Sequence, residues 1–379
     1  VTGVPAVTWM SLLLTWFPKP SGPHPVGSCD VEVPIQDGVD SKSSVGRYFC
    51  ARIFYPAGSN SDLRDHWLPQ PSSSYAKAMG CVYGLPPILS HLLLFPARFI
   101  LQRTLRHAEV ASGRWPVALF SHGLCGTRFM YSTLCTELAS HGYIVIAPEH
   151  TDGSAILAFR DGNVVNYVPS SEANLKKRTQ HRISELRACW DSISVIADAK
   201  FARCVETSAC VLVGHSFGAA TVLSAASSEP FLNRSRLVIL DPWIGPVADV
   251  WNPVAAPTLA IMTGSMLWEP NASELVHVLA ELDTPLQPAL LTEIIDARHQ
   301  DVSDVPFFLH VPMAVITASS QRRSGFSMWK TYAELMRRFL QFDEGSRACE
   351  SEASKLSKLS AVPGACVHRW RDWLYQNPQ

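Results

Sequence analysis

The sequence predicts an α/β fold, with a mostly parallel central sheet flanked by helices. The chain has 379 residues, of which 47% are apolar, and so can bury a large core. From about residue 115, apolar runs alternate with stretches of helical periodicity, which indicates consecutive strand–helix units. The runs are nearly continuous in Val, Ile, Leu and Ala, as is typical of strands buried on both faces.

The expected elements follow from these patterns. Strands are expected at residues 48–55, 116–120, 143–147, 210–213, 237–240, 258–262 and 291–295. Helices are expected at 131–140, 179–197, 219–227 and 273–282, with an amphipathic C-terminal helix at 328–342.

We expect one main domain with a short segment at either end. Residues 21–345 form this domain, and its first part, residues 21–114, is rich in Pro, Ser and Gly and should be an irregular extension packed on the core. Residues 1–20 are expected to be either disordered or membrane-associated, and residues 346–379 to form a C-terminal tail.

Composition and charge exclude several function classes. The formal net charge is −1 and the basic clusters are short, so the chain lacks the concentrated positive field that nucleic acids require. The ten cysteines form no CxxC pair and no Cys/His spacing suited to zinc, so no metal is expected. Glycosylation sequons at Asn233 and Asn271 leave the compartment open between cytoplasm and secretion. The start at Val1 leaves targeting and lipidation open as well.

The strongest motif is Gly214-His215-Ser216-Phe217-Gly218, which has the form GxSxG. A β-branched run precedes it and a helix start follows, so Ser216 is expected at a tight strand-to-helix turn. Glycines two residues to either side lack the Cβ atoms that would collide there. The free N–H groups at the helix start favour developing negative charge. Ser216 is therefore the predicted nucleophile, and His215 is expected to support the turn.

A serine hydroxyl is a poor nucleophile unless a general base, usually histidine oriented by a carboxylate, takes its proton. In folds of this kind the chain order is serine, acid, histidine. The candidate bases are His277, His299, His310 and His368. His299 is favoured because it follows the apolar run 291–295 and should emerge at the carboxyl end of a strand. This chemistry uses protein groups alone, so no cofactor is expected.

The leading candidate for the acid is Asp241, which directly ends the first expected strand after the nucleophile's helix. Many proteins of this kind place the acid one strand later, which keeps Glu269 and Asp283 as alternatives. Asp296 and Asp301 lie too close to the favoured histidine in sequence. Asp241 has an alternative interpretation as a turn residue, because a proline follows it.

The expected strand 116–120 runs into Ser121-His122-Gly123-Leu124, a turn of the kind that supplies one N–H group of an oxyanion hole. The second N–H group comes from the residue after the nucleophile. Leu124 and Phe217 are therefore assigned to the hole, and His122 is expected to orient the turn.

Longer stretches of the sequence match a known family. They are Phe120-Ser-His-Gly-Leu124, Leu138-Ala-Ser-His-Gly-Tyr143, Glu149-His150, Gly214 through Thr221, Leu240-Asp-Pro-Trp243 and His299-Gln300, with Gly22 through Gly27 and Trp67-Leu-Pro69 nearer the start. The chain resembles the platelet-activating factor acetylhydrolases, plasma and intracellular type II. The resemblance implies an α/β-hydrolase fold and a calcium-independent phospholipase A2 that removes short or oxidised sn-2 acyl groups. It also implies the triad Ser216, Asp241 and His299, and so favours Asp241 as the acid.

Three departures from the family pattern concern the substrate rather than the hydrolase chemistry. Ala219 replaces the usual second Gly of the turn, Pro242 replaces Ala after the acid, and the loop after His299 differs. The alternative function is a general carboxylesterase or polyester-type hydrolase of the same fold.

Residues 85–106 are a candidate contact with membranes or lipid particles. Residues 85–95 are strongly apolar, and Arg98, Arg103 and Arg106 follow at helical spacing, a pattern typical of an interfacial helix. The alternative is a helix buried against the sheet, because three prolines interrupt the pattern. Phospholipid is the expected substrate, and the oligomeric state stays open.

Overall fold

The fold is known from a computed structural model that describes residues 17–35, 47–58, 63–82, 84, 86, 88–90, 95–193, 201–229, 232, 235–246, 256–283, 289–294, 296–307, 325–341, 358–363 and 365–369. Most of the expected terminal segments 1–20 and 346–379 lie outside the described residues, as do Asn233 and His310.

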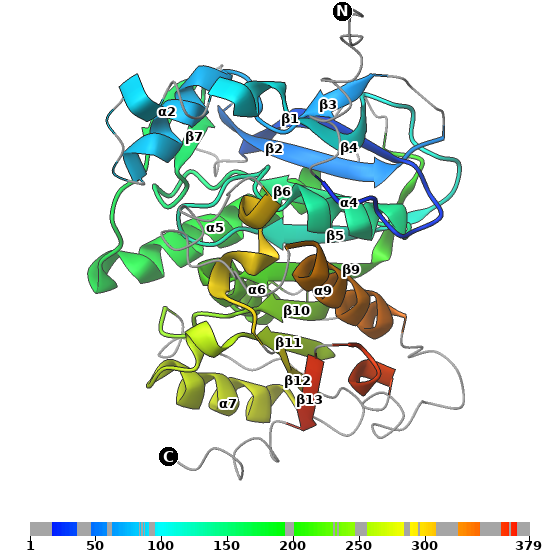
Figure 1. Cartoon of the computed structure of the whole chain (residues 1–379), viewed down its shortest axis with the longest axis vertical. Coiled ribbons are helices and arrows are strands. Elements are labelled where there is room, and N and C mark those ends of the chain that lie inside the picture. Colours follow the sequence, from blue (N-terminus) through cyan, green and yellow to red (C-terminus); the bar gives the residue numbers. More distant parts are fainter. Residues whose placement is uncertain are drawn as a thin grey trace, which may run out of the picture.

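The described strands form one mixed sheet of 13 strands, in the order β13-β12-β11-β10-β9-β5-β6-β2-β1-β4-β3 (Figure 1). The hairpin β7–β8 pairs with β2 off this path. The strands are β1 (Val26–Ile35), β2 (Arg47–Pro56), β3 (Arg64–His66), β4 (Leu101–Arg106), β5 (Trp115–Ser121), β6 (Ile144–Pro148), β7 (Leu157–Arg160), β8 (Asn163–Asn166), β9 (Val205–His215), β10 (Arg236–Leu240), β11 (Thr258–Met262), β12 (Ala289–Ile294) and β13 (Ala365–Arg369).

The middle of the sheet is parallel. Strands β6, β5, β9, β10, β11 and β12 all run in the same direction, and every residue of β6 and β11 is buried. An antiparallel pair borders this parallel set on each side: β2 pairs with β6, and β13 pairs with β12. The carboxyl ends of the parallel strands therefore meet along one edge, where open α/β sheets place their functional groups.

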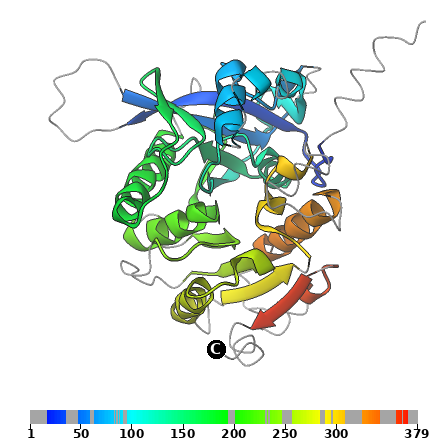
Figure 2. The ribbon, with the colours of Figure 1, turned by 60° about the vertical axis from the view of Figure 1, so that its left-hand side comes forward.

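Helices cover both faces of the sheet. The helices are α2 (Ser72–Val82), α4 (Ser132–Ser140), α5 (Glu172–Ser192), α6 (Phe217–Ser228), α7 (Asn271–Leu282) and α9 (Gly325–Leu340). Short 3-10 turns are η1 (Phe95–Phe99), η3 (Gly264–Met266), η4 (His299–Val302) and η5 (Val305–Phe307). Apolar residues of α5, α6 and α7 share one buried cluster, and those of α2, α4 and α9 share the other. Figure 2 shows α5 and α6 (green) and α9 (orange) on opposite sides.

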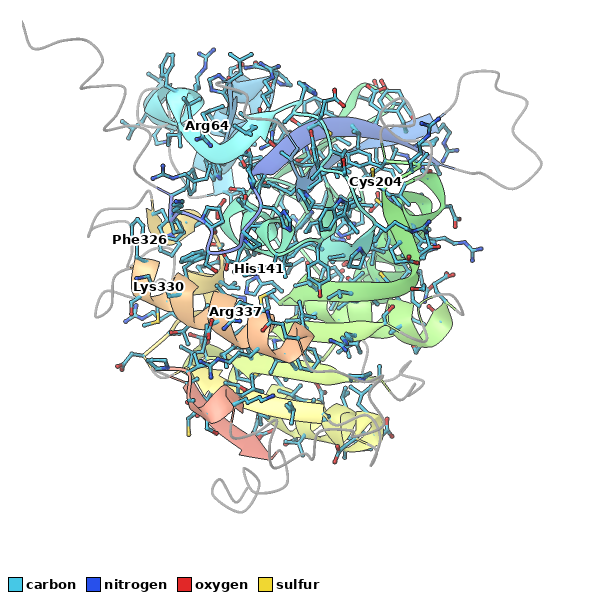
Figure 3. All side chains as sticks on the ribbon, turned by 90° about the vertical axis from the view of Figure 1, so that its right-hand side faces the viewer. Arg64, His141, Cys204, Phe326, Lys330 and Arg337 are labelled. Carbon is cyan, nitrogen blue, oxygen red and sulfur yellow. The ribbon has the colours of Figure 1, made fainter. Side chains whose placement is uncertain are left out.

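Helix α9 shows how the spacing of apolar residues determines which face of a helix is buried. Met328, Tyr332, Leu335 and Phe339 recur at helical spacing and are at most 2% exposed, packed in the second cluster. The opposite side carries charged residues, among them Lys330, which Figure 3 shows along the outside of the helix.

The predicted fold class is confirmed, and each expected strand and helix has an observed counterpart. The largest shift is in α5, which begins at Glu172 rather than 179 and ends at Ser192. Among the helices that the structure describes, none is both long and apolar enough to cross a membrane.

The N-terminal extension is more regular than expected. Instead of one strand, residues 21–114 contribute β1 to β4 and α2, and they complete the sheet. Strand β1 pairs with β2 over ten residues, from Val26 opposite Pro56 to Ile35 opposite Arg47. Polar residues alternate with apolar ones in β1, because one side of this antiparallel strand reaches solvent.

The expected helical spacing of Arg98, Arg103 and Arg106 is wrong. Arg98 lies in the 3-10 turn η1, whereas Arg103 and Arg106 lie in the extended strand β4. Pairing of β4 with β1 and β3 satisfies its backbone and overrides the local pattern. Exposed apolar side chains nevertheless occur in this region, at Ile88 (79% exposed) and Phe99 (51%).

Candidate active site

Ser216 lies at the sharp turn between β9 and α6. Its backbone has φ 55° and ψ −121°, a strained conformation for a residue with a side chain. The glycines on either side are required by close packing. A Cβ on Gly214 would lie 2.3 Å from the Gly218 carbonyl oxygen, and one on Gly218 would lie 2.0 Å from that of Ser121. The turn therefore holds Ser216 in place, as the GxSxG motif predicts.

The loop after β10 ties this turn to the next strand. The Ser216 N–H group donates to the Leu240 carbonyl (3.0 Å), and the Trp243 N–H group donates to the Ser216 carbonyl (3.3 Å). These bonds lie on either side of Asp241, so the turn and the start of the acid loop are fixed relative to each other.

Asp241 and His299 form a hydrogen-bonded pair. Nδ1 of His299 lies 2.6 Å from Oδ2 of Asp241, whose side chain is fully buried. Thr263, at the end of β11, donates to both carboxylate oxygens, through its N–H group (2.7 Å to Oδ1) and its hydroxyl (2.8 Å to Oδ2). The carboxylate thus orients the imidazole, and Nε2 of His299 is left to exchange a proton.

The pair lies beside the Ser216 turn. The ring of His299 packs on that of His215, with centroids 4.5 Å apart, and His215 directly precedes Ser216. His299 is 21% exposed at its side chain, so a substrate can reach it. Residues separated by more than 80 positions in the chain thus converge at the carboxyl edge of the sheet.

The alternative bases and acids lie elsewhere or have other contacts. His277 is 75% exposed on α7 and pairs with Glu281. His310 lies outside the described residues, and His368 belongs to the antiparallel edge strand β13. Glu269 accepts a hydrogen bond from Ser273, and Asp283 is the C-terminal cap of α7.

The two candidate oxyanion N–H groups make no hydrogen bond within the described structure. Leu124 lies in the turn after β5, and Phe217 is the first residue of α6. Unpaired N–H groups at a strand exit and a helix start suit a developing negative charge.

Tyr131 links the two turns, a role that the sequence did not indicate. Its hydroxyl accepts from the Gly123 N–H group (3.3 Å) and bonds Nδ1 of His215 (2.8 Å). Burial, and then the neighbouring His299, lowers the pKa of His215 well below its usual range. His215 is therefore neutral, and it supports the turn as expected.

His122 is buried and orients its own turn. Its Nδ1 lies 2.8 Å from the Gly123 carbonyl, and its Nε2 accepts from the His150 N–H group (3.2 Å). Burial, then the charge of Arg182 and the neighbouring His150, lowers the pKa of His122 well below its usual range. A neutral, fully engaged imidazole is a structural element of the turn and not a proton shuttle.

The Asn271 side chain is buried, which conflicts with glycosylation at its sequon. This side chain is 0% exposed, accepts from the Ile244 N–H group (2.8 Å) and donates to the carbonyls of Pro242 and Met266. An amide enclosed in this way holds the loop after Asp241, so it is no acceptor for a glycan in the folded chain.

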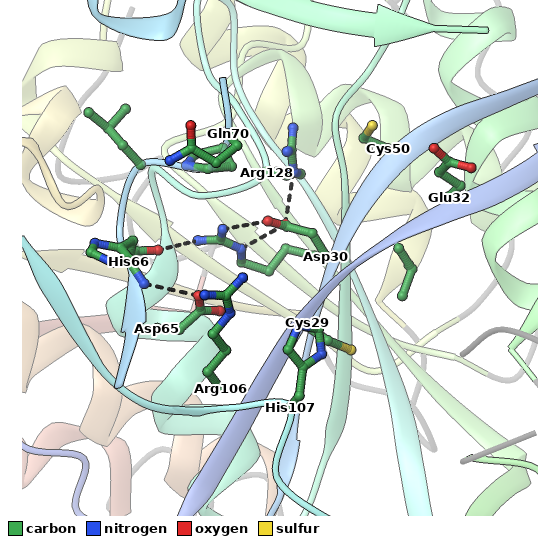
Figure 4. Close-up of a pocket in the computed structure, with 14 residues that line it drawn as sticks. Cys29, Asp30, Glu32, Cys50, Asp65, His66, Gln70, Arg106, His107 and Arg128 are labelled. Atoms are coloured by element: carbon green, nitrogen blue, oxygen red, sulfur yellow. Dashed lines mark hydrogen bonds and ion pairs between the residues drawn. The ribbon is translucent and has the colours of Figure 1, made fainter. Parts of the chain in front are cut away.

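A cavity of about 630 Å³ opens beside residues 121–125, the turn after β5 that holds one candidate oxyanion N–H group (the oxyanion turn). Residues of α2, the β7–β8 hairpin and the turn line it, including Ala78, Val82, Cys125, Ile156 and Leu157. A larger cavity of about 850 Å³ lies elsewhere (Figure 4), and the lining of neither cavity contains a predicted triad residue. There Asp30 pairs with the buried Arg52 and Arg128.

A comparison with protein families decides the family. The model for "Platelet-activating factor acetylhydrolase, isoform II" matches residues 12–188 and 196–341. The chain belongs to this family. The predicted resemblance is therefore confirmed over most of the chain.

Individual relatives agree with this membership. A platelet-activating factor acetylhydrolase of Cavia porcellus is 28% identical over 302 residues, which cover 69% of this chain and 66% of the relative. The enzyme of the same name from Canis lupus familiaris is 24% identical over 323 residues, covering 77% and 69%. The chain thus spans about two thirds of the length of these relatives.

A solved structure supports the fold alone. A ferulic acid esterase from Streptomyces cinnamoneus superimposes with a TM-score of 0.64 at 17% identity, covering 92% of this chain and 98% of that one.

Proposed function

We propose that this family member is a serine ester hydrolase that removes short or oxidised sn-2 acyl groups from phospholipids such as platelet-activating factor. The observation that carries the proposal is the Asp241–His299 hydrogen bond of 2.6 Å beside the strained Ser216 turn. Family membership supports the substrate class.

The reaction proceeds through an acyl-enzyme. Nε2 of His299 takes the proton of the Ser216 hydroxyl as its oxygen attacks the sn-2 carbonyl carbon. The N–H groups of Leu124 and Phe217 stabilise the negative charge on the carbonyl oxygen. The tetrahedral intermediate collapses, and His299 returns the proton to the leaving lysophospholipid oxygen. Water, deprotonated by His299, then releases the acid and regenerates Ser216.

The chains of the substrate extend into the cavity beside the turn after β5, whose lining includes Cys125, next to Leu124, and none of the proposed triad residues. Its lining is mostly apolar, with Ala78, Val82, Ile156 and Leu157, and Lys77 adds one cation. Apolar walls suit acyl or alkyl chains, and an ammonium group suits a phosphate.

The test is hydrolysis of a phosphatidylcholine with a short sn-2 acyl group. Replacement Ser216→Ala should lower kcat by about 10⁴-fold or more, since nucleophile removal leaves only binding effects. The matched control is Ser208→Ala, an exposed serine on the same strand, which should keep full activity. Activity should persist in EDTA. Undiminished turnover in Ser216→Ala would contradict the proposal.

Soluble and micellar substrates separate the two ester-hydrolase alternatives. A phospholipid hydrolase should accelerate when the substrate passes its micelle threshold. A general carboxylesterase should turn over monomeric short esters faster and show no such step.

We also propose peripheral contact with a lipid surface through exposed side chains after α2. Ile88 is 79% exposed, Leu89 41% and Phe99 51%, and burying such apolar groups in a bilayer interface is favourable.

The double replacement Ile88→Ser/Phe99→Ser should lower co-sedimentation with phosphatidylcholine vesicles several-fold and leave hydrolysis of a soluble ester unchanged. Phe326→Ser, which removes a 41%-exposed aromatic from α9, is the control. Equal vesicle binding by both variants would exclude this surface.

A further inference from the structure

Arg182 contacts both turns that carry the candidate oxyanion N–H groups. It lies on α5 and is 0% exposed. Its Nη1 donates to the His122 carbonyl at 2.6 Å, two residues before Leu124. Its guanidinium carbon also lies 4.4 Å from the centre of the Phe217 ring. One side chain therefore touches the oxyanion turn and the first residue of α6.

The remaining donors of Arg182 secure the far end of the oxyanion turn. Nη2 donates to the Ser154 hydroxyl (2.5 Å), and Nε donates to Oδ2 of Asp152 (3.0 Å). The Ser154 carbonyl in turn accepts from the Cys125 N–H group (2.8 Å). The turn is thus held directly at His122 and, through Ser154, at Cys125, with Leu124 between these two anchors.

Only a guanidinium can make all of these contacts at once. Its planar fork offers five N–H donors in fixed directions, and its face packs on an aromatic ring. A lysine ammonium in the same place keeps the charge but cannot reach the carbonyl, the hydroxyl, the carboxylate and the ring together. Oxyanion stabilisation depends on donor placement, because a displacement of about 1 Å costs roughly 100-fold in rate.

We infer that Arg182 is a positioning residue that fixes the Leu124 and Phe217 N–H groups relative to each other. It acts through these two residues and does not touch the substrate. This inference rests on the proposed function, whose oxyanion hole it completes. The neighbouring Glu185, on the same side of α5, secures the loop after β6 in a similar way, by accepting from the Thr151 N–H group (2.9 Å).

The test separates chemistry from binding. Pre-steady-state acylation by p-nitrophenyl acetate gives the acylation rate constant and the apparent dissociation constant separately. In Arg182→Lys, the rate constant should fall about 10- to 100-fold, while the dissociation constant changes by less than about 3-fold. The control is Arg178→Lys, one turn earlier on α5. Arg178 is also buried (5% exposed), but it binds the Val168 carbonyl and the Ser170 hydroxyl, so both constants should stay within about 3-fold.

A second variant keeps the test decisive if Arg182→Lys does not fold. Arg182→Met/Asp152→Asn removes the buried cation together with its anion, and should lower the rate constant at least as far as Arg182→Lys. Near-UV circular dichroism and Tm identify the folded variants. An unchanged rate constant in a folded Arg182 variant, or a loss confined to the dissociation constant, overturns the inference.

Ser216→Ala, measured in the same assay, shows whether a negative result refutes the role of Arg182 or the proposed function. If Ser216→Ala abolishes acylation while Arg182→Lys acylates normally, the proposed function stands and only the role of Arg182 is wrong. If Ser216→Ala acylates like the wild type, the proposed function itself fails.

Discussion

At the residue scale, the proposed acid and base form a pair whose geometry depends on how tightly the Asp241 carboxylate is held. Both oxygens of Asp241 accept hydrogen bonds, from Thr263 and His299, and the side chain is fully buried. A carboxylate satisfied in this way fixes the tautomer and orientation of the imidazole instead of accepting its proton. Thr263 therefore contributes to the candidate site through Asp241.

The first prediction concerns this carboxylate. Asp241→Asn keeps the shape of the side chain but offers an NH₂ group to Nδ1 of His299, which favours the wrong tautomer. We expect kcat for a short-chain ester to fall by about 10³- to 10⁴-fold with a largely unchanged KM. Asp283→Asn, at the end of α7, is the control and should retain wild-type kcat. Comparable losses in the two variants would argue against Asp241 as the acid.

At the element scale, the connection between β9 and α6 is set by close backbone contact. The start of α6 packs against the end of β5, where Gly218 faces the Ser121 carbonyl. This contact brings the Phe217 N–H group and the oxyanion turn to the same edge of the sheet. The helix and the strand can approach so closely only because no side chain lies between them.

The second prediction tests that contact. Gly218→Ala would place a Cβ 2.0 Å from the Ser121 carbonyl oxygen, so the helix must shift. We expect a loss of about 1–3 kcal/mol in the free energy of unfolding, measured by urea titration, together with a lower kcat. Gly264→Ala is the matched control, because its added Cβ meets no atom within 4 Å. A Gly218→Ala variant as stable and active as the control would show that the helix start can move freely.

At the scale of the whole molecule, carboxylates paired with buried cationic or imidazole groups join the N-terminal strands and α5 to the core. Asp30 on β1 binds Arg52 on β2 (2.8 Å) and Arg128 after the oxyanion turn (3.0 Å). The Asp30 side chain is 37% exposed; its partial burial raises the pKa of the carboxyl, but the charges of the buried Arg52 and Arg128 outweigh this and lower it. In Glu185 burial again raises the pKa, and hydrogen bonds from His150 and His181 lower it well below its usual range.

The third prediction follows from the sign of these shifts. A carboxyl whose folded pKa is lowered stabilises the fold above its unfolded pKa of about 4, and this contribution disappears as the pH falls further. The free energy of unfolding should therefore decrease between about pH 5 and pH 3, by at most about 1.4 kcal/mol per pH unit for each such group. Glu185→Gln should be less stable at pH 7 and show a shallower acid decline.

The control for this series is Glu32→Gln, which replaces an exposed carboxylate on β1. Its stability profile should follow that of the wild type. Parallel acid declines in the wild type and Glu185→Gln would mean that Glu185 is not a source of the acid sensitivity.

Local sequence determined the parallel core and the position of the Ser216 turn. Continuous apolar runs mark buried strands by themselves, and GxSxG places Ser216 at a turn whose strain only flanking glycines permit. The proximity of Asp241 and His299 could be predicted because each follows the end of a parallel strand, and strand ends of one direction meet at one edge. The first strands were harder to predict, since β1 alternates polar and apolar residues and forms only through its pairing with β2.

Tertiary structure alone decided which side chains surround these residues. The roles of Tyr131, Thr263 and Arg182 could not be read from local sequence, because they depend on contacts between elements far apart in the chain. The same holds for Arg103 and Arg106, where strand pairing overrode a helical spacing. A sequence pattern specifies local backbone and burial, whereas a hydrogen bond across the core exists only when packing brings donor and acceptor together.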